Sequence, residues 1–504
     1  MMNIGTSQRI MELKDKVRKS FFWVISTRIV DQGAYLGAMV ILARLLSPED
    51  FGLIAIALVF VGVVDSVNEF GLGEAIIQKK DLGENDLYSA FWFSILLALI
   101  LYLILFFAAP LIAEFYDRAK LVIIIRLLGL NFLFSLASLV PRSLLTKELA
   151  FEKLSKADVG STLMYSFCAV ILAIEGYGIW SLIVGSLLRY SFLSILTFYY
   201  LPWKPKFIFS IKQVSGLLTF GVFVTGGSIL RYFYSNSDYL IVGRFLGTRL
   251  LGYYTMAFQL ATFFINELGA IVVRISFPIF SKLQDDRESL ASSFLRVTRY
   301  ISLLSFPLFI GGIILSRDLV EVFLTSKWFP ILLPFQVLCG IGLLRSIDVI
   351  IPPLLNSKNR PGLNFMYNLI CSIIMPVGFL VGVKHGIPGI SYAWLIIYPF
   401  LFMYLLSFGI KLLNVPLIQY LRNLFPSIIG TLFMGISTFL VIRVLESATP
   451  ILRLAIGILF GITSYVCFFA IFQQDLISDL KRNLVADVFH GNSEGAFKME
   501  VPKR

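Results

Sequence analysis

Charged and metal-binding side chains are scarce in this sequence. Asp, Glu, Lys and Arg make up 15% of the 504 residues, and only two histidines are present, His385 and His490. The four cysteines lie inside apolar stretches without paired spacing, so we expect neither disulfides nor a metal site. A Walker A sequence is absent. These shortages argue against a zinc enzyme, a nucleotide hydrolase and a disulfide-stabilised secreted domain.

Apolar residues, by contrast, dominate the chain. They make up 58% of it, and the mean hydropathy is +0.84. A water-soluble domain of this composition would expose large apolar patches. Apolar runs of about 20 residues, long enough to cross the hydrocarbon core of a bilayer, recur along nearly the whole chain. The sequence therefore predicts an all-α polytopic membrane protein with about fourteen transmembrane helices.

The apolar runs predict two six-helix lobes followed by two further helices. We expect a cytoplasmic N-terminal segment, a first lobe, a cytoplasmic linker, a second lobe, a final helix pair and a cytoplasmic tail at 1–19, 20–201, 202–212, 213–411, 418–472 and 473–504. The individual helices are expected at 20–46, 50–78, 86–110, 120–146, 156–175, 178–201, 213–243, 250–279, 291–316, 330–356, 362–383, 388–411, 418–443 and 450–472.

The net charge of +12 does not point to nucleic acid, because Lys and Arg are spread over many loops and form no basic arm or face. They are concentrated in alternate loops. Under the positive-inside rule this alternation places both ends of the chain in the cytoplasm. The apolar segment after residue 19 is too long for a signal peptide and is expected to be retained as the first helix.

An internal repeat supports the two-lobe organisation. Residues 41–52 (ILARLLSPEDFG) align without a gap on residues 241–252 (IVGRFLGTRLLG), with the same apolar pattern. Both copies place an arginine, Arg44 or Arg244, at the end of the first helix of a lobe. An even number of crossings in each lobe would give the two copies the same orientation in the membrane.

The stretch ARLLSPEDFGL at 43–53, followed by FGLGEAIIQ at 70–78, resembles the opening hairpin of bacterial polysaccharide export proteins. These are the Wzx-like flippases of the O-antigen, teichuronic-acid and colanic-acid type, in the multidrug/oligosaccharidyl-lipid/polysaccharide (MOP) superfamily. The resemblance implies a MATE-like, V-shaped pair of lobes in the bacterial inner membrane. Their cavity would be lined mainly by the first, second, seventh and eighth helices.

The same resemblance implies a substrate and partners. Such flippases move undecaprenyl-diphosphate-linked oligosaccharide to the outer leaflet by alternating access, for surface polysaccharide assembly. The implied partners are the lipid-linked oligosaccharide and membrane lipids. A polysaccharide polymerase and chain-length proteins are further candidates. The glycan, the oligomeric state and the conformation favoured at rest are not predicted.

Ionisable residues inside membrane helices are costly and usually face a cavity or a partner. Arginine can hold two oxygens of a diphosphate at once, so Arg28, Arg231 and Arg274 are the preferred substrate-binding candidates. The spacing of three residues places Asp31 on one helix face with Arg28, and Asp348 with Arg345. The candidate substrate-binding residues are therefore Arg28, Asp31, Arg231, Arg274 and Arg345. The alternative interpretation is that these pairs fix helix packing, and that Arg274 extends to the membrane surface.

Buried carboxylates can bind a proton or Na⁺ when a cavity opens. The candidate ion-coupling residues are Asp31, Asp65, Glu69, Asp238 and Glu267. They would equally balance the charge of the cavity arginines, and the residues do not decide between the two roles. Apart from H⁺ or Na⁺ as a coupling ion, no cofactor is expected.

Two other functions compete with a flippase. A MATE-type drug or cation antiporter would share the fold, but a cavity that mixes arginines with carboxylates favours an anionic substrate. A membrane polymerase or glycosyltransferase would need a large outer loop or an exposed acidic site. The longest expected outer loop, 317–329, is short. We therefore expect a transporter without catalytic residues.

Overall fold

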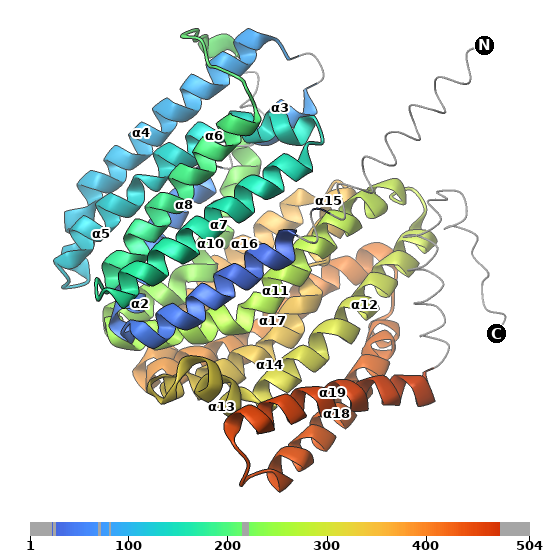
Figure 1. Cartoon of the computed structure of the whole chain (residues 1–504). Helices are drawn as coiled ribbons and strands as arrows, with labels where there is room; N and C mark the ends of the chain where they lie inside the picture. The colour runs from blue at the N-terminus through green and yellow to red at the C-terminus, as the bar shows by residue number, and fades with distance from the viewer. Residues whose placement is uncertain (1–22, 24–26, 69–71, 80–81, 214–220, 474–504) are drawn as a thin grey trace.

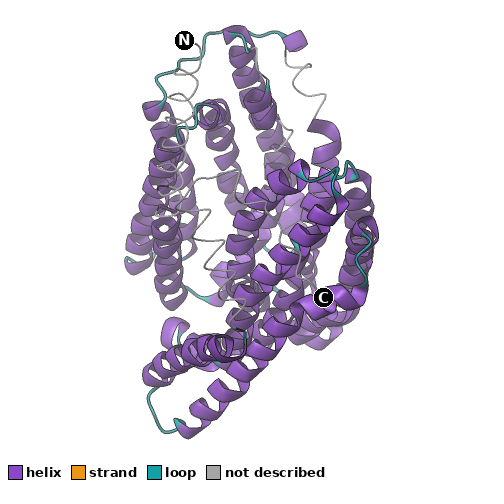
Figure 2. Cartoon of the chain, turned by 90° about the vertical axis from the view of Figure 1, so that its right-hand side faces the viewer, coloured by secondary structure: helices purple, strands orange, loops and turns teal. Residues whose placement is uncertain are grey.

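The computed structural model describes residue 23 and residues 27–68, 72–79, 82–213 and 221–473, with some side chains inside these ranges left undescribed. Helices make up nearly all of this part of the chain, and no strand occurs in it (Figure 2). The all-α fold class is confirmed. Every one of the fourteen predicted segments contains helix where it is described.

The first helix covers residues 27–45. Up to the linker, the further helices are α2 (Pro48–Asn68), α3 (Leu72–Gln78), α4 (Glu84–Phe115), α5 (Lys120–Gly129), α6 (Asn131–Lys147), α7 (Phe151–Ile174) and α8 (Ile179–Tyr200). After the linker come α10 (Gly221–Phe245), α11 (Thr248–Lys282), α12 (Arg287–Ile314), α13 (Ser316–Leu319), α14 (Leu332–Asp348), α15 (Ile351–Ser357), α16 (Pro361–Gly382), α17 (Gly386–Leu413), α18 (Leu417–Val444) and α19 (Pro450–Phe472). Three short helical turns cover Val320–Leu324, Ser326–Ile331 and Val383–His385.

Nine helical stretches in the described residues are long and apolar enough to cross a membrane, and one of them, Pro361–Leu413, contains both α16 and α17. The count of fourteen crossings stays a prediction. Large apolar side chains cover the outside of the helices: Phe107 is 70% exposed and Val444 83%. Such a surface is stable only against lipid, so the chain is a multi-pass membrane protein.

The start of α2 follows directly from the sequence SPED. The Ser47 hydroxyl accepts a hydrogen bond from the Asp50 backbone N–H at 3.2 Å, and the Asp50 carboxylate accepts one from the Ser47 N–H at 3.0 Å. This reciprocal capping box satisfies two donors that a helix start leaves free, and Pro48 fits the first helical position. In the second repeat, α11 begins after Gly247 and its start has no side-chain cap. Gly247 has φ +84°, a conformation that favours glycine.

Two segments predicted as single helices are interrupted. The segment 120–146 is divided at Leu130 into α5 and α6, and the segment 330–356 is divided before Ile351 into α14 and α15. The second break has a clear cause. Pro352 and Pro353 occupy the first turn of α15, and proline lacks the backbone N–H that would continue the ladder of α14.

The helices form two bundles, one from the first helix to α8 and one from α10 to α17 (Figure 1). Helix α2 carries much of the packing between them, because it lies against both α10 and α11 of the second bundle. The predicted residue boundaries of the lobes are not tested by this arrangement and stay predictions.

The last two helices, α18 and α19, are attached to the second bundle. Helix α18 packs on α12, where Arg299 donates to the Asn423 side-chain oxygen at 2.9 Å. The Arg453 guanidinium of α19 forms an ion pair of 2.6 Å with Asp318 of α13, whose side chain is 5% exposed. These contacts hold the hairpin on the second bundle.

Candidate functional site

The backbones of the two bundles touch where α2 and α11 begin. A Cβ atom on Gly52 would collide with the carbonyl oxygen of Thr248, and one on Gly252 would collide with that of Pro48. The two contacts are equivalent under the internal repeat, in which Gly52 corresponds to Gly252 and Pro48 to Thr248. Glycine is required at both positions because the backbones touch. We call this end of the molecule, at residues 43–52 and 243–252, the closed end.

Arg44 fastens the first bundle to the second at the closed end. Its guanidinium donates to the carbonyl oxygens of Phe323, at 2.8 Å, and Val322. These carbonyls belong to the helical turn Val320–Leu324. A cation is favourable there, because the last carbonyls of a helical segment lack partners and carry partial negative charge.

Side chains of the second bundle also donate to main-chain carbonyls of the first bundle. The Lys327 ammonium donates to the carbonyl oxygens of Arg44 and Leu46, at 2.6 and 2.8 Å. The Trp328 indole N–H donates to the Ala43 carbonyl at 2.8 Å. Each bundle therefore caps a helix end of the other. We call this set of contacts, made by Arg44, Lys327 and Trp328, the clasp.

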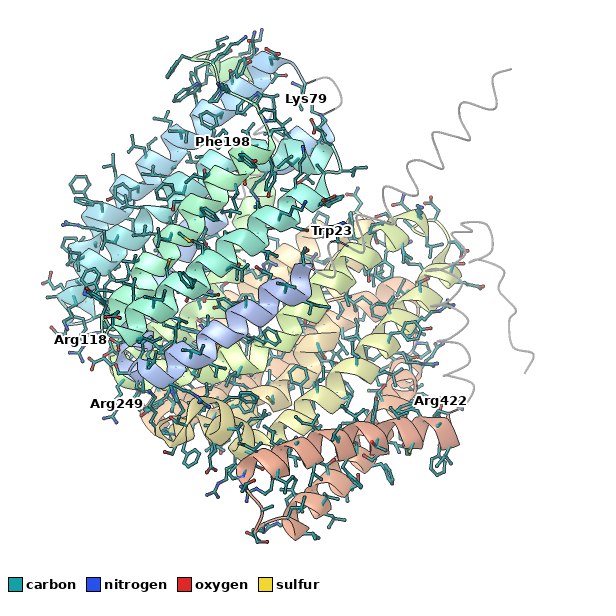
Figure 3. All side chains as sticks on the ribbon, viewed as in Figure 1. Trp23, Lys79, Arg118, Phe198, Arg249 and Arg422 are labelled. Atoms are coloured by element: carbon teal, nitrogen blue, oxygen red, sulfur yellow. The ribbon has the colours of Figure 1, made fainter. Side chains whose placement is uncertain are left out.

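Figure 3 shows how the labelled side chains are distributed over the molecule. Arg118 and Arg249 lie at the closed end, whereas Trp23 and Lys79 lie toward the opposite end.

Two polar candidates on the first helix, Arg28 and Asp31, precede the clasp by several turns and are partly buried. Atom Oδ1 of Asp31 is buried and has no hydrogen-bond partner among the described residues. Such an oxygen is available to an external donor or cation.

Arg231 is exposed on α10. Its neighbour Tyr232 reaches the first bundle, because its hydroxyl donates to the Val59 carbonyl of α2 at 3.0 Å. The structure thus places Arg231 on a helix that borders the other bundle. The remaining cavity candidates, Asp65, Glu69, Glu267 and Arg274, lie outside the residues whose side chains are described.

Asp238 lies at the centre of a polar network inside the second bundle. It is 0% exposed, and its Oδ2 accepts hydrogen bonds from the Tyr254 hydroxyl at 2.6 Å and the Trp394 indole N–H at 3.1 Å. Its Oδ1 accepts from the Tyr239 backbone N–H at 2.9 Å. Helices α10, α11 and α17 thus supply three donors to one carboxylate, which satisfies a group that would otherwise be too costly to bury.

Arg345 continues this network on α14. Its guanidinium lies 5.1 Å from the centre of the Trp394 ring and 5.5 Å from that of Phe258. Arg345 and Asp348 share α14 but form no ion pair with each other, and the Asp348 carboxylate accepts from the Tyr398 hydroxyl instead. No hydrogen bond or ion pair joins Arg345 to any described residue. The bundle holds this cation by aromatic faces and by the two nearby carboxylates.

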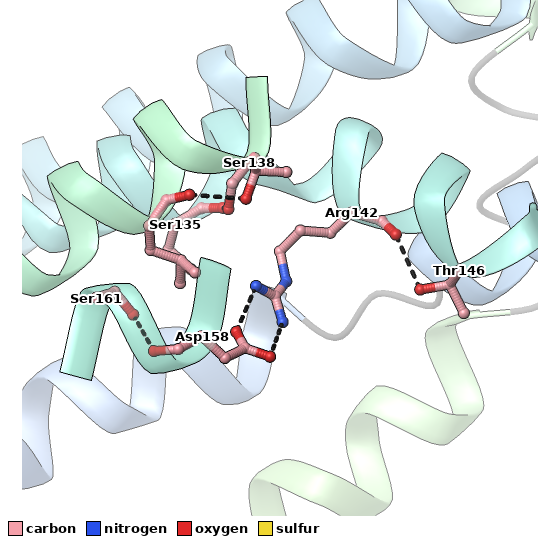
Figure 4. Close-up of polar contacts among 8 residues, drawn as sticks. Ser135, Ser138, Arg142, Thr146, Asp158 and Ser161 are labelled. Carbon is pink, nitrogen blue, oxygen red and sulfur yellow. Dashed lines mark hydrogen bonds and ion pairs between the residues drawn. The ribbon is translucent and has the colours of Figure 1, made fainter. Parts of the chain in front are cut away.

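The first bundle pairs its partly exposed charges differently. Arg142 of α6 contacts both carboxylate oxygens of Asp158 of α7, at 2.8 and 3.4 Å (Figure 4). Arg126 lies over the Phe106 ring at 3.9 Å and donates to the Phe106 carbonyl at 3.2 Å. These arginines are used by contacts within their own bundle, which favours a packing role for them.

The sequence did not reveal Tyr254, Trp394 and Tyr398 as partners of the buried carboxylates. They lie on other helices, and aromatic residues in apolar segments are too common to single out. The clasp was missed for a similar reason. Arg44 was recognised as a repeated position, but its partners lie more than 270 residues further along the chain.

Comparison with known proteins places the chain in a family. The family model described as "Polysaccharide biosynthesis protein" matches residues 41–333. The chain belongs to this family. It is 29% identical to the lipopolysaccharide biosynthesis protein WzxC of Escherichia coli over 77% of this chain and 79% of the relative. It is 28% identical to the teichuronic acid biosynthesis protein TuaB of Bacillus subtilis, over 79% and 84% of the two chains.

Solved structures share the fold of this polysaccharide biosynthesis protein. The lipid II flippase MurJ, in an inward closed conformation, matches 90% of this chain and 100% of its own with a TM-score of 0.71 at 20% identity. An inward-facing MATE-family multidrug transporter of the MOP superfamily matches 76% of this chain and 95% of its own, with a TM-score of 0.56 at 14% identity. The expected MATE-like architecture is confirmed.

Proposed function

We propose that this protein is a flippase that carries a diphosphate-linked lipid oligosaccharide across the bacterial inner membrane for surface polysaccharide assembly. The proposal is supported by its family and by relatives named for polysaccharide biosynthesis and transport, including the succinoglycan biosynthesis transport protein ExoT of Rhizobium meliloti, which is 28% identical over 62% of this chain. The observation that carries it is the repeat-related junction at the closed end, where two bundles meet through backbone contacts and paired helix caps.

A junction of this kind suits alternating access. From the distribution of Lys and Arg we propose that both ends of the chain lie in the cytoplasm and that the closed end lies at the outer face. In the observed state the clasp closes the outer face. Transport then requires the bundles to separate at the clasp and to approach each other at the cytoplasmic end, so that the substrate head group changes sides.

The diphosphate would be held between the bundles by arginines of the first, seventh and eighth helices. Arg28 lies on the first helix and Arg231 on α10, which reaches α2 through Tyr232. Arg274 belongs to α11, which packs on α2. A guanidinium binds phosphate oxygens in a bidentate manner, and its charge offsets that of the head group. Asp31, one turn from Arg28, has a free buried oxygen that suits a sugar hydroxyl or a coupling cation.

Coupling to a proton or Na⁺ gradient is proposed to act through the second bundle. Asp238 and Asp348 both lie near Arg345, so protonation or cation binding at either carboxylate changes the charge balance around a fixed cation. Asp238 lies on α10, which also reaches α2 through Tyr232. A change in the charge of Asp238 would therefore act on a helix that contacts the other bundle.

Transport without catalysis is the expected activity, with the lipid-linked oligosaccharide as substrate and the polymerase and chain-length proteins as proposed partners. The direct test is a deletion strain complemented with Arg28→Ala, Arg231→Ala or Arg274→Ala, together with the matching Lys variants. Exposed Arg422, on the final helix pair, provides the control Arg422→Ala.

We expect the Ala variants to lose surface polysaccharide and to accumulate lipid-linked oligosaccharide at normal membrane levels, while Arg422→Ala behaves as wild type. Normal surface polysaccharide in all three Ala variants would rule out the proposed diphosphate site. If purified protein exported cationic dyes and did not flip lipid-linked oligosaccharide, the antiporter alternative would replace the flippase.

A further inference from the structure

A recess of about 480 Å³ lies at the closed end on the seam between the bundles. Helices α2 and α4 form one wall with Phe60, Leu111 and Phe115, and helices α10 and α16 form the other with Ile241 and Leu380. Leu111 is 70% exposed and Phe115 54%, so the recess opens toward the lipid that surrounds the protein. The recess is therefore an apolar site on the membrane-facing side of the junction.

The recess has one charged lining residue, Arg244. Its guanidinium lies 5.1 Å from the centre of the Phe115 ring and makes no hydrogen bond or ion pair with any described residue. A cation on the membrane-facing surface of a transmembrane helix is costly unless an anion or the interface compensates it. The structure supplies the aromatic contact and leaves the anion to come from outside the chain.

The internal repeat shows what this corner lacks. Arg44, the counterpart of Arg244, is satisfied by carbonyl oxygens of Phe323 and Val322. The adjacent volume is filled by Trp328, which is 0% exposed and packs edge-on against Phe51 with ring centres 5.5 Å apart. The segment that supplies these groups covers residues 315–331, between α12 and α14.

At the Arg244 corner the equivalent connection, between α4 and α5, covers only residues 116–119. It contributes the Tyr116 hydroxyl, which donates to the Leu240 carbonyl at 3.3 Å, but no group that fills the recess or accepts from Arg244. Within the described part of the chain, an apolar volume and an anion position therefore stay open side by side.

We propose that a glycerophospholipid occupies this corner, with an acyl chain in the recess and its phosphate on the Arg244 guanidinium. Such a lipid matches both features at once, since it joins an apolar chain to an anion at interface depth. Because the recess has a wall from each bundle, the bound lipid bridges the seam and stabilises the closed state. Placing the lipid in the outer leaflet rests on the proposed orientation, whereas the site itself does not.

Native mass spectrometry of the full chain in detergent, titrated with phosphatidylglycerol, tests the proposal without any transport assay. We expect Arg244→Gln to weaken phosphatidylglycerol binding about tenfold, the loss expected for a charge-assisted contact. Leu111→Trp places an indole at the recess and keeps the charge of Arg244. This variant should also weaken phosphatidylglycerol binding.

Two matched controls lie on α18, away from the seam. Arg443 has its guanidinium 5.2 Å from the Phe439 ring centre, as Arg244 has on Phe115, so Arg443→Gln removes a similar cation–π pair. Val444→Trp adds an indole at a lipid-facing site. Both controls should retain the wild-type affinity.

Wild-type phosphatidylglycerol affinity in both Arg244→Gln and Leu111→Trp would overturn the proposal. So would equal losses in the α18 controls, because binding would then be a general property of the apolar surface. Displacement of the lipid by inorganic phosphate alone would show a soluble-anion site instead. A failure of flipping with lipid binding intact would count against the proposed function and leave the lipid site standing.

Discussion

The two corners of the closed end occupy equivalent places in the repeat but are built differently. At the Arg44 corner, the clasp links the bundles by hydrogen bonds from Arg44, Lys327 and Trp328 to main-chain carbonyls. At the Arg244 corner, one hydrogen bond of 3.3 Å from Tyr116 and a cation–π contact cross the seam. The protein itself completes the first corner and leaves the second open to lipid.

This difference indicates which corner yields first. Separating the Arg44 corner exposes several helix-end carbonyls and their donors, whereas separating the Arg244 corner breaks few polar contacts. The seam should therefore open from the Arg244 side, with the clasp as the later and more costly step. Lipid composition would act mainly on the weaker corner.

The largest expected effect is at the glycine contact that both corners share. Gly52→Ala or Gly252→Ala puts a methyl group against a backbone carbonyl that cannot move aside, and should destabilise the closed state by about 3 kcal/mol or more. Thermal unfolding and flipping by reconstituted protein measure the loss. Gly33→Ala is the control, since its Cβ would meet nothing within 4 Å. Wild-type flipping by both junction variants would contradict the proposed backbone junction.

Next in size is the contrast between the two arginines. Arg44→Ala removes charge-assisted hydrogen bonds and should shift the equilibrium away from the closed state by about 2 kcal/mol. Arg244→Ala removes an exposed cation–π contact, worth about 0.5 to 1 kcal/mol. Distances between spin labels placed across the closed end, measured by electron paramagnetic resonance, report the population of the closed state in each variant. Equal shifts in detergent without added phospholipid would remove the distinction between the corners.

A smaller effect is expected from Asp238→Asn, which tests whether Asp238 couples transport to an ion gradient. The variant keeps the shape of the side chain but removes the negative charge to which Tyr254 and Trp394 donate hydrogen bonds. Weakening these charge-assisted bonds should cost about 1.5 kcal/mol of stability. Flipping should lose its dependence on an imposed proton or Na⁺ gradient, while the distance across the clasp stays as in the wild type. Gradient dependence that persists would exclude Asp238 as a coupling group.

The smallest effect should come from a helix cap remote from both corners. Asp286 precedes α12, and hydrogen bonds from the Ser289 hydroxyl and backbone lower the pKa of its carboxyl. A lowered native pKa contributes stability above the unfolded-state pKa, and this is lost as pH falls through the native value. Asp286→Ala should therefore slightly lower the melting temperature at pH 7, and the difference should shrink in acid. If the distances across the Arg44 and Arg244 corners changed in this variant, those distances would depend on the overall stability of the protein and not on the corner contacts.

Much of the fold could be predicted from the sequence, because apolar length and repeated charge patterns are local signals. The capping box of α2 is legible in SPED, and the Arg44 and Arg244 repeat indicated equivalent helix ends. The site was harder to predict. The carbonyls that hold Arg44 carry no sequence signal, and the difference between the corners arises from the lengths of two connections, 116–119 and 315–331.

The most direct test of alternating access at the closed end is a reversible cross-link across it. The Thr248 hydroxyl donates to the Glu49 carboxylate at 3.1 Å, so the Glu49→Cys and Thr248→Cys pair brings two thiols together from opposite bundles. In reconstituted protein supplied with lipid-linked oligosaccharide, the oxidised pair should stop flipping and a reducing agent should restore it. Flipping at the wild-type rate with the disulfide formed would contradict the account.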